Sequence, residues 1–142
     1  MLLTRSRAAT EPSAATALTA PPVLLVEDWQ GLREVFAELL EHEGYAVTAV
    51  PDGAEALRHL ESGARPALIL LDLEMPVLDG WGLLAQLQDE PEYSAIPVVL
   101  LSGVETLPLE ARRLGVDGYL RKPVEPDILL QVVRMFCGAP LP

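Results

Sequence analysis

Short apolar runs alternate along the chain with segments in which apolar residues recur every three or four positions. Runs of four or five residues, such as 67–71 before Asp72, predict strands that are buried on both faces of a sheet. The recurring stripes predict helices that each pack one face on that sheet. The predicted strands are 23–26, 46–50, 67–71, 97–101 and 118–121, and the predicted helices lie around 32–40, 54–60, 83–87, 105–114 and 126–136.

Five strands that alternate with five helices favour one α/β domain with a parallel sheet and helices on both faces. The uniformly apolar strands 23–26, 67–71 and 98–101 are expected in the interior of the sheet. The strands 46–50 and 118–121 carry polar residues and suit its edges. This arrangement is the flavodoxin-like, doubly wound order 2-1-3-4-5. In such a sheet, ligands bind where the chain reverses direction, at the carboxyl ends of strands 1 and 3.

Composition narrows the classes of function. The 142 residues include 21 acidic and 10 basic ones, with a formal charge of −11 and no Lys/Arg cluster, which argues against direct binding of nucleic acid. No apolar stretch approaches the roughly 20 residues that span a bilayer, so no membrane association is expected. The single Cys137 cannot close an intrachain disulfide, and a cytoplasmic protein is therefore expected.

The first 21 residues differ in composition from the rest of the chain. They are rich in Ala, Thr and Pro and lack the continuous apolar centre of a secretory signal, which predicts a disordered tail. A transit peptide fits poorly because of Glu11 and the prolines. The folded domain is expected over residues 22–138, with no output domain after it.

Polar residues follow four of the predicted strands at the edge of the sheet where ligands bind. Glu27 and Asp28 follow the first strand and Asp72 the third, so three carboxylates are expected close together. Their mutual repulsion at neutral pH would be costly without a counter-ion, and a hard divalent cation such as Mg²⁺ suits their oxygens. Ser102 follows the fourth strand, and Lys122, the only lysine of the chain, follows the fifth.

Each of these residue types has an ordinary explanation when it is taken alone. Acids in loops are usually solvated surface, a serine at a strand end is usually a helix cap, and a lysine is usually a solvated charge. Independent surface residues have no reason to converge at one edge of one sheet, each directly after an apolar run. The convergence therefore indicates a functional site.

Four motifs follow one another along the chain, each at the end of a predicted strand. They are V-L-L-V-E-D at 23–28, L-I-L-L-D-L-E-M-P-V-L-D-G at 68–80, V-L-L-S-G at 99–103 and G-Y-L-R-K-P at 118–123. Together and in this order they resemble the receiver domain of two-component response regulators, over about residues 22–137. The resemblance implies a phosphorelay signalling module whose own chemistry is limited to its phosphorylation and dephosphorylation, rather than an enzyme.

The resemblance assigns a role to each residue that matches the family's pattern. Asp72 would accept a phosphoryl group from a histidine kinase or a histidine phosphotransfer protein, and Lys122 would pair with that group. Glu27, Asp28, Asp72 itself and the backbone carbonyl of Glu74 would hold Mg²⁺. The acidic pair is Glu-Asp rather than the commoner Asp-Asp, which lengthens one arm and favours Asp28 as the direct ligand.

The resemblance also implies a conformational switch. Ser102 would hydrogen-bond a phosphoryl oxygen, and Tyr119 would rotate into the space behind it. The surface of the fourth helix, fifth strand and fifth helix would then change for a downstream protein partner, and a phosphorylation-dependent dimer is compatible with that change. The stretch from Ser102 to Tyr119 is short and contains Pro108, so a short or distorted fourth helix is expected. Members of the family usually have a cis peptide bond at the position of Lys122-Pro123.

Two other functions compete with this interpretation. A haloacid-dehalogenase-like phosphatase would use Asp72 as its nucleophile and Glu74 as the acid two residues later. That family normally has Asp at the second position and carries the motif on its first strand, whereas here a whole βαβ unit precedes it. The other alternative is a receiver that binds partners without phosphorylation, and the full set of acids, hydroxyl and lysine argues against it.

Overall fold

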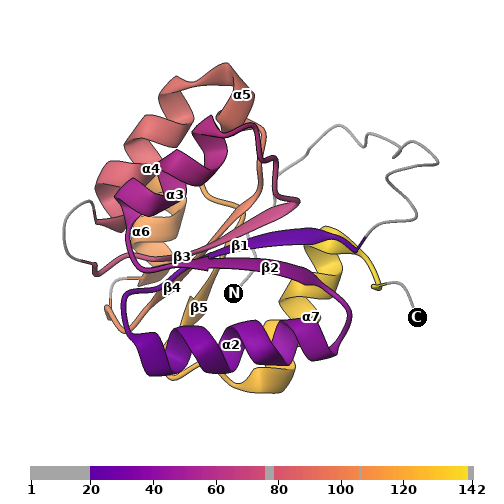
Figure 1. The fold of residues 1–142 in the computed structure, drawn as a ribbon. Helices are drawn as coiled ribbons and strands as arrows, with labels where there is room; N and C mark the ends of the chain where they lie inside the picture. The colour runs from indigo at the N-terminus through magenta and orange to yellow at the C-terminus, as the bar shows by residue number, and fades with distance from the viewer. Residues whose placement is uncertain (1–19, 76–78, 106, 141–142) are drawn as a thin grey trace.

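The computed structural model describes residues 20–75, 79–105 and 107–140. Residues 1–19, which make up nearly all of the expected N-terminal tail, lie outside the described residues, as does Pro76 of the predicted loop. The described part forms a five-stranded parallel sheet in the order β2-β1-β3-β4-β5, with helices on both faces (Figure 1). The predicted fold class and strand order are therefore confirmed.

The central strands could be predicted from the sequence because they are buried on both faces of the sheet. The strands are β1 (Pro22–Val26), β2 (Ala46–Val50), β3 (Leu68–Asp72), β4 (Val98–Ser102) and β5 (Gly118–Arg121). Every residue of β3 and β4 is buried, so these strands are apolar without alternation up to their last residue. The more polar β2 and β5 lie at the two edges, as expected.

Alternate residues of the central strands belong to two separate hydrophobic cores, one on each face of the sheet. In β3, Ile69 and Leu71 pack with α3 (Gly53–Glu61), α4 (Gly80–Asp89) and α6 (Leu107–Leu114). Leu68 and Leu70 point to the other face and pack with α2 (Gln30–His42) and α7 (Pro126–Cys137). Figure 1 shows these two groups of helices on opposite sides of the sheet.

Of the helices, α5 (Pro91–Ser94) was not predicted from the sequence, and α6 has the short length that was expected. With four residues, α5 is too short to show a helical period. The helix α6 has eight residues, fewer than the other helices that cover the sheet, in agreement with the short fourth helix expected around Pro108. No helix in the described part of the chain is long and apolar enough to cross a membrane.

A glycine brings the start of α4 against the end of β3. A Cβ atom on Gly80 would lie 2.6 Å from both the carbonyl oxygen of Asp72 and the Cα atom of Leu73. The amide of Gly80 donates to the Leu73 carbonyl at 3.1 Å, and the Asp79 side chain accepts from the Gly82 amide at 2.8 Å. The Asp-Gly pair thus caps α4 and lets it approach the backbone directly after Asp72.

Candidate functional site

Three carboxylates meet at the carboxyl edge of the sheet. Glu27 and Asp28 follow β1, Asp72 ends β3, and one carboxylate oxygen from each lies within 4.8 Å of the others. The register explains this proximity, because Val26 pairs with Leu71 and the next residues of both strands are therefore neighbours. Glu27 and Asp72 are buried, whereas Asp28 is exposed. The structure thus brings together the three acids that the sequence placed at this edge.

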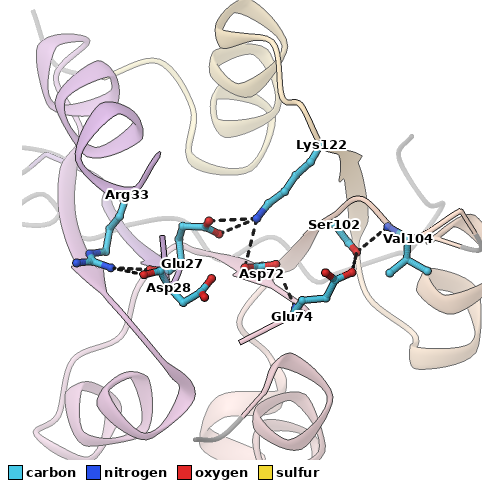
Figure 2. A network of polar contacts seen from close by, with 8 residues as sticks. All are labelled: Glu27, Asp28, Arg33, Asp72, Glu74, Ser102, Val104 and Lys122. Atoms are coloured by element: carbon cyan, nitrogen blue, oxygen red, sulfur yellow. Dashed lines mark hydrogen bonds and ion pairs between the residues drawn. The ribbon is translucent and has the colours of Figure 1, made fainter. Parts of the chain in front are cut away.

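The ammonium of Lys122 reaches into this cluster from the end of β5 (Figure 2). Its Nζ lies 3.1 and 3.0 Å from the two carboxylate oxygens of Glu27 and 3.3 Å from Oδ2 of Asp72. The backbone amide of Lys122 also donates to the Ser102 carbonyl at 2.9 Å, and the Lys122-Pro123 peptide bond is cis, as the resemblance implied. The sequence predicted Lys122 at this edge but did not predict its bonds to Glu27.

Burial and like charge alter the acidity of the cluster. Burial and the negative charge of Glu27 raise the pKa of Asp72 to about 7, against the opposing effects of Lys122 and the Glu74 amide. Burial disfavours the charged form of Lys122, but its hydrogen bond to Glu27 and the charge of Asp72 outweigh burial and raise its pKa. The ion pairs therefore hold Lys122 protonated beside two buried carboxyl groups.

The donor set fits a hard divalent cation. Three carboxylates against one ammonium leave an excess of two negative charges when all are ionised, with the Asp28 carboxylate outside the Lys122 ion pairs. Carboxylate oxygens are the ligands that Mg²⁺ prefers in proteins, usually with water and phosphate oxygens. Among the described residues, this is the cluster of acids whose geometry could hold a metal ion.

A chain of hydrogen bonds joins Asp72 to the end of β4. The backbone amide of Glu74 donates to Oδ1 of Asp72 at 3.2 Å. The Ser102 hydroxyl lies 3.5 Å from the Glu74 carboxylate and accepts a bond from the Val104 amide at 3.1 Å (Figure 2). A Cβ atom on Gly103 would meet nothing within 4 Å, so the position after Ser102 is open. The structure therefore places Ser102 and the Glu74 side chain beside the acid cluster.

Tyr119 lies apart from this cluster. It is on β5, opposite Leu100 of β4 in the sheet register, and its side chain is half-buried against the core under α3, α4 and α6. This position is on the face of the sheet that α6 covers. Tyr119 therefore lies within β5 on the face of the sheet that α6 covers, and not at the strand end that carries Lys122.

Two arginines contact the site through backbone carbonyls and were not singled out from the sequence. Arg33 donates to the carbonyls of Glu27 and Asp28, and Arg121 donates to those of Val104 and Glu105. No sequence motif predicts a hydrogen bond from an arginine to a backbone carbonyl. The position of Arg33 could still have drawn attention to it, because a positive charge near the N-terminus of a helix interacts unfavourably with the helix dipole unless other bonds hold it there.

Comparison with known proteins agrees with the sequence motifs. A family model for the response regulator receiver domain matches residues 23–134. The transcriptional regulatory protein CseB of Streptomyces coelicolor is 39% identical over 117 residues, which are 79% of this chain and 47% of that protein. An uncharacterised 14.6 kDa protein of Leptolyngbya boryana is 34% identical over 82% of this chain and 90% of its own length. The chain thus spans about half the length of CseB and most of the smaller relative.

Solved structures match over the same part of the chain. The chemotaxis response regulator CheY4 of Vibrio cholerae is 29% identical, with a TM-score of 0.76 over 83% of this chain and 99% of CheY4. The receiver domain of the sensor histidine kinase PA1611 from Pseudomonas aeruginosa, which has a magnesium ion in its active-site cleft, is also 29% identical. Its TM-score is 0.75, over 84% of this chain and 99% of that domain. None of these matches supports the dehalogenase-like alternative.

Proposed function

The chain belongs to the response regulator receiver domain family, and we propose that Asp72 accepts a phosphoryl group from a histidine kinase or a histidine phosphotransfer protein. Receiver domains as a family interact with such phosphodonors and with downstream effectors. The observation that carries the proposal is the convergence at one sheet edge of a buried aspartate, two further acids and the single lysine. The turnover of an external substrate is not part of this function.

Asp72 and its neighbours are arranged for phosphoryl transfer. An Asp72 oxygen would attack phosphorus, so that a P–O bond forms while the P–N bond of the donor phosphohistidine breaks. The electron pair returns to the imidazole nitrogen, which takes up a proton. Lys122 is held 3.3 Å from Asp72 by its bonds to Glu27, where its charge stabilises the equatorial oxygens of the group in transfer.

We further propose that Mg²⁺ binds to the carboxylates of Asp28 and Asp72 and to the backbone carbonyl of Glu74. Glu27 belongs to the same metal site as the second acid of the acidic pair. The excess negative charge and the three oxygens within 4.8 Å support this ligand set. When bound, the ion neutralises negative charge on the carboxylates and on the phosphoryl oxygens. Glu27 already shares both of its oxygens with Lys122, which supports Asp28 as the direct ligand.

Removing the exposed acid of the cluster should remove the response to Mg²⁺. Mg²⁺ binds the folded site and not the dispersed carboxylates of the unfolded chain, so saturating Mg²⁺ should stabilise the wild type by about 1–3 kcal/mol. Asp28→Ala should lose most of that gain, and in EDTA it should be at least as stable as the wild type because repulsion is relieved. Urea unfolding with and without Mg²⁺ measures both effects.

Asp89→Ala is the matched control, because Asp89 is an exposed aspartate at the end of α4, outside the acid cluster. Its response to Mg²⁺ should equal that of the wild type. A full Mg²⁺ response in Asp28→Ala would show that the metal is bound elsewhere.

The signal would leave through the α6, β5 and α7 face of the domain. For the Ser102 hydroxyl to donate to a phosphoryl oxygen on Asp72, it would exchange the bond that it donates to the Glu74 carboxylate at 3.5 Å for one to the phosphoryl group. Tyr119 would then fill the space behind Ser102 and change the surface beside α6. We propose that a protein partner, or a second copy of the phosphorylated chain, reads this surface in the cytoplasm.

Uptake of a phosphoryl group from a small donor tests the proposal. The full chain is incubated with Mg²⁺ and acetyl phosphate, and intact mass measurement should show one added phosphoryl group that alkali removes. Borohydride reduction converts a phosphorylated aspartate into homoserine, which peptide mass spectrometry should locate at position 72. No adduct on a chain that still binds Mg²⁺ would favour a receiver that acts without phosphorylation.

A further inference from the structure

Arg33 bonds to the backbone of both acids at the end of β1. Its Nη1 donates to the Glu27 carbonyl at 2.9 Å and to the Asp28 carbonyl at 3.2 Å. Figure 2 shows the guanidinium on one side of the acidic pair and Lys122 on the other. Arg33 is half-buried, and its own amide donates to Trp29 at 2.9 Å, so the side chain starts from the first full turn of α2.

This placement works against the electrostatics of the helix. The N-terminal end of a helix carries a partial positive charge and favours acids, not arginine. The first turn of α2 contains no acid, and Trp29 at the N-cap makes no side-chain capping bond. Arg33 therefore does not stabilise this end of α2 through its charge, and its bonds to the two carbonyls account for its position.

The bonds fix the peptide groups that carry the acids. The amide of Glu27 donates to the Val50 carbonyl of β2 at 3.0 Å, which extends the sheet by one residue. Arg33 holds the carbonyl on the other side of the same residue, and the next carbonyl as well. With both sides of the backbone held, Glu27 is placed for its ion pair with Lys122, and the oxygens of Glu27 and Asp28 lie within 4.8 Å of Asp72.

We propose that Arg33 is a positioning residue for the metal-binding acids, which it orders through their backbone before any cation arrives. The proposal rests on the proposed function, since it concerns the same Mg²⁺ site. Groups that orient metal ligands from outside the coordination sphere commonly change metal affinity by an order of magnitude or more.

The direction in which Mg²⁺ affinity changes when Arg33 is removed distinguishes a positioning role from a purely electrostatic one. A guanidinium near the acids repels an incoming cation, so loss of its charge alone would make Mg²⁺ bind more tightly. Loss of positioning has the opposite effect, because the carboxylates would have to be ordered when the ion binds. Arg33→Ala should therefore bind Mg²⁺ about tenfold more weakly than the wild type, although its charge has become more negative.

Calorimetric titration of the full chain with MgCl₂ measures this change. Arg58→Ala is the matched control for charge, because Arg58 is an exposed arginine on α3 that pairs with Glu55. It should bind Mg²⁺ as the wild type does or slightly more tightly. Arg33→Lys keeps the charge with one donor group and should lie between the wild type and Arg33→Ala. Equal or tighter binding in Arg33→Ala would overturn the proposal.

A second measurement needs no metal. In EDTA, hydrogen exchange of the amides of residues 27–30 should be faster in Arg33→Ala than in the wild type, with no such change in Arg58→Ala. Unchanged exchange in this segment would also overturn the proposal. A wild type that does not bind Mg²⁺ at all would instead overturn the proposed metal site, whereas the exchange measurement would still decide whether Arg33 orders the acids.

Discussion

Asp72→Asn is expected to take up no phosphoryl group. In Mg²⁺-free buffer at about pH 8, its free energy of unfolding should be about 2–4 kcal/mol higher than that of the wild type. The first effect follows from the loss of the attacking oxygen. The second follows from the cost of ionising a buried carboxyl beside Glu27, which raises its pKa from the ordinary 3.8 to about 7. Asparagine has nearly the same shape, carries no charge and leaves Lys122 paired with Glu27.

The pH dependence of this difference gives the sharper test. Well below pH 3.8, Asp72 is protonated in both the folded and the unfolded chain, and its ionisation costs the folded state nothing. Between pH 3.8 and about 7 the unfolded chain ionises first, so the penalty on the folded wild type grows with pH and is complete above that window. The stability advantage of Asp72→Asn should therefore rise through this window and then level off.

Urea unfolding of both proteins in EDTA across this range measures the effect. Asp89→Asn serves as the control, because Asp89 is an exposed surface residue, and its free energy of unfolding should differ from that of the wild type by no more than about 0.5 kcal/mol. An Asp72→Asn variant that is less stable than the wild type above pH 7 would contradict the prediction. It would mean that the bonds of Asp72 to Lys122 and the Glu74 amide outweigh the cost of its burial.

Lys122→Met is expected to lower the free energy of unfolding by about 2–3 kcal/mol at neutral pH without Mg²⁺. Methionine keeps the length of the side chain but leaves the buried Glu27 carboxylate without its two hydrogen bonds. A fully buried pair would lose more, but the Lys122 side chain is 26% exposed and water screens part of the interaction. Mg²⁺ should restore part of the loss, because it supplies positive charge to the same acids.

The double variant Lys122→Met with Asp72→Asn tests the cause. If charge repulsion is responsible, the second substitution should recover stability, and the two effects should differ from additivity by more than 0.5 kcal/mol or so. Arg112→Met removes an exposed cation from α6 and should change stability by no more than about 0.5 kcal/mol. Strictly additive effects would show that Lys122 and Asp72 do not interact energetically.

The sequence predicted most of the fold because the strands are buried on both faces. Residues 68–71 and 98–101 are apolar without interruption, and one buried polar residue ends each strand. The acid cluster could be predicted for the same reason, since parallel strands bring their carboxyl ends to one edge. The helix α5 could not be predicted, because four residues are little more than one helical turn.

The contacts of long side chains could not be predicted. Lys122 follows β5 and Glu27 follows β1, and two strands lie between them in the sheet, so their pairing depends on how far both side chains reach. The resemblance implied a bond from Lys122 to the phosphoryl group and said nothing of its partner before phosphorylation. The bonds of Arg33 and Arg121 to carbonyls depend on the path of the loops, which apolar periodicity does not determine.

The single lysine gives the site its own spectroscopic label. Lys122 is the one lysine in the sequence, and its ammonium lies between Glu27 and Asp72. Lysine labelled with ¹⁵N at Nζ would therefore give one side-chain ammonium resonance from the chain, located beside the proposed phosphoacceptor Asp72. Metal binding, phosphoryl uptake and phosphoryl loss could each be followed at that resonance without a mutation or an attached dye.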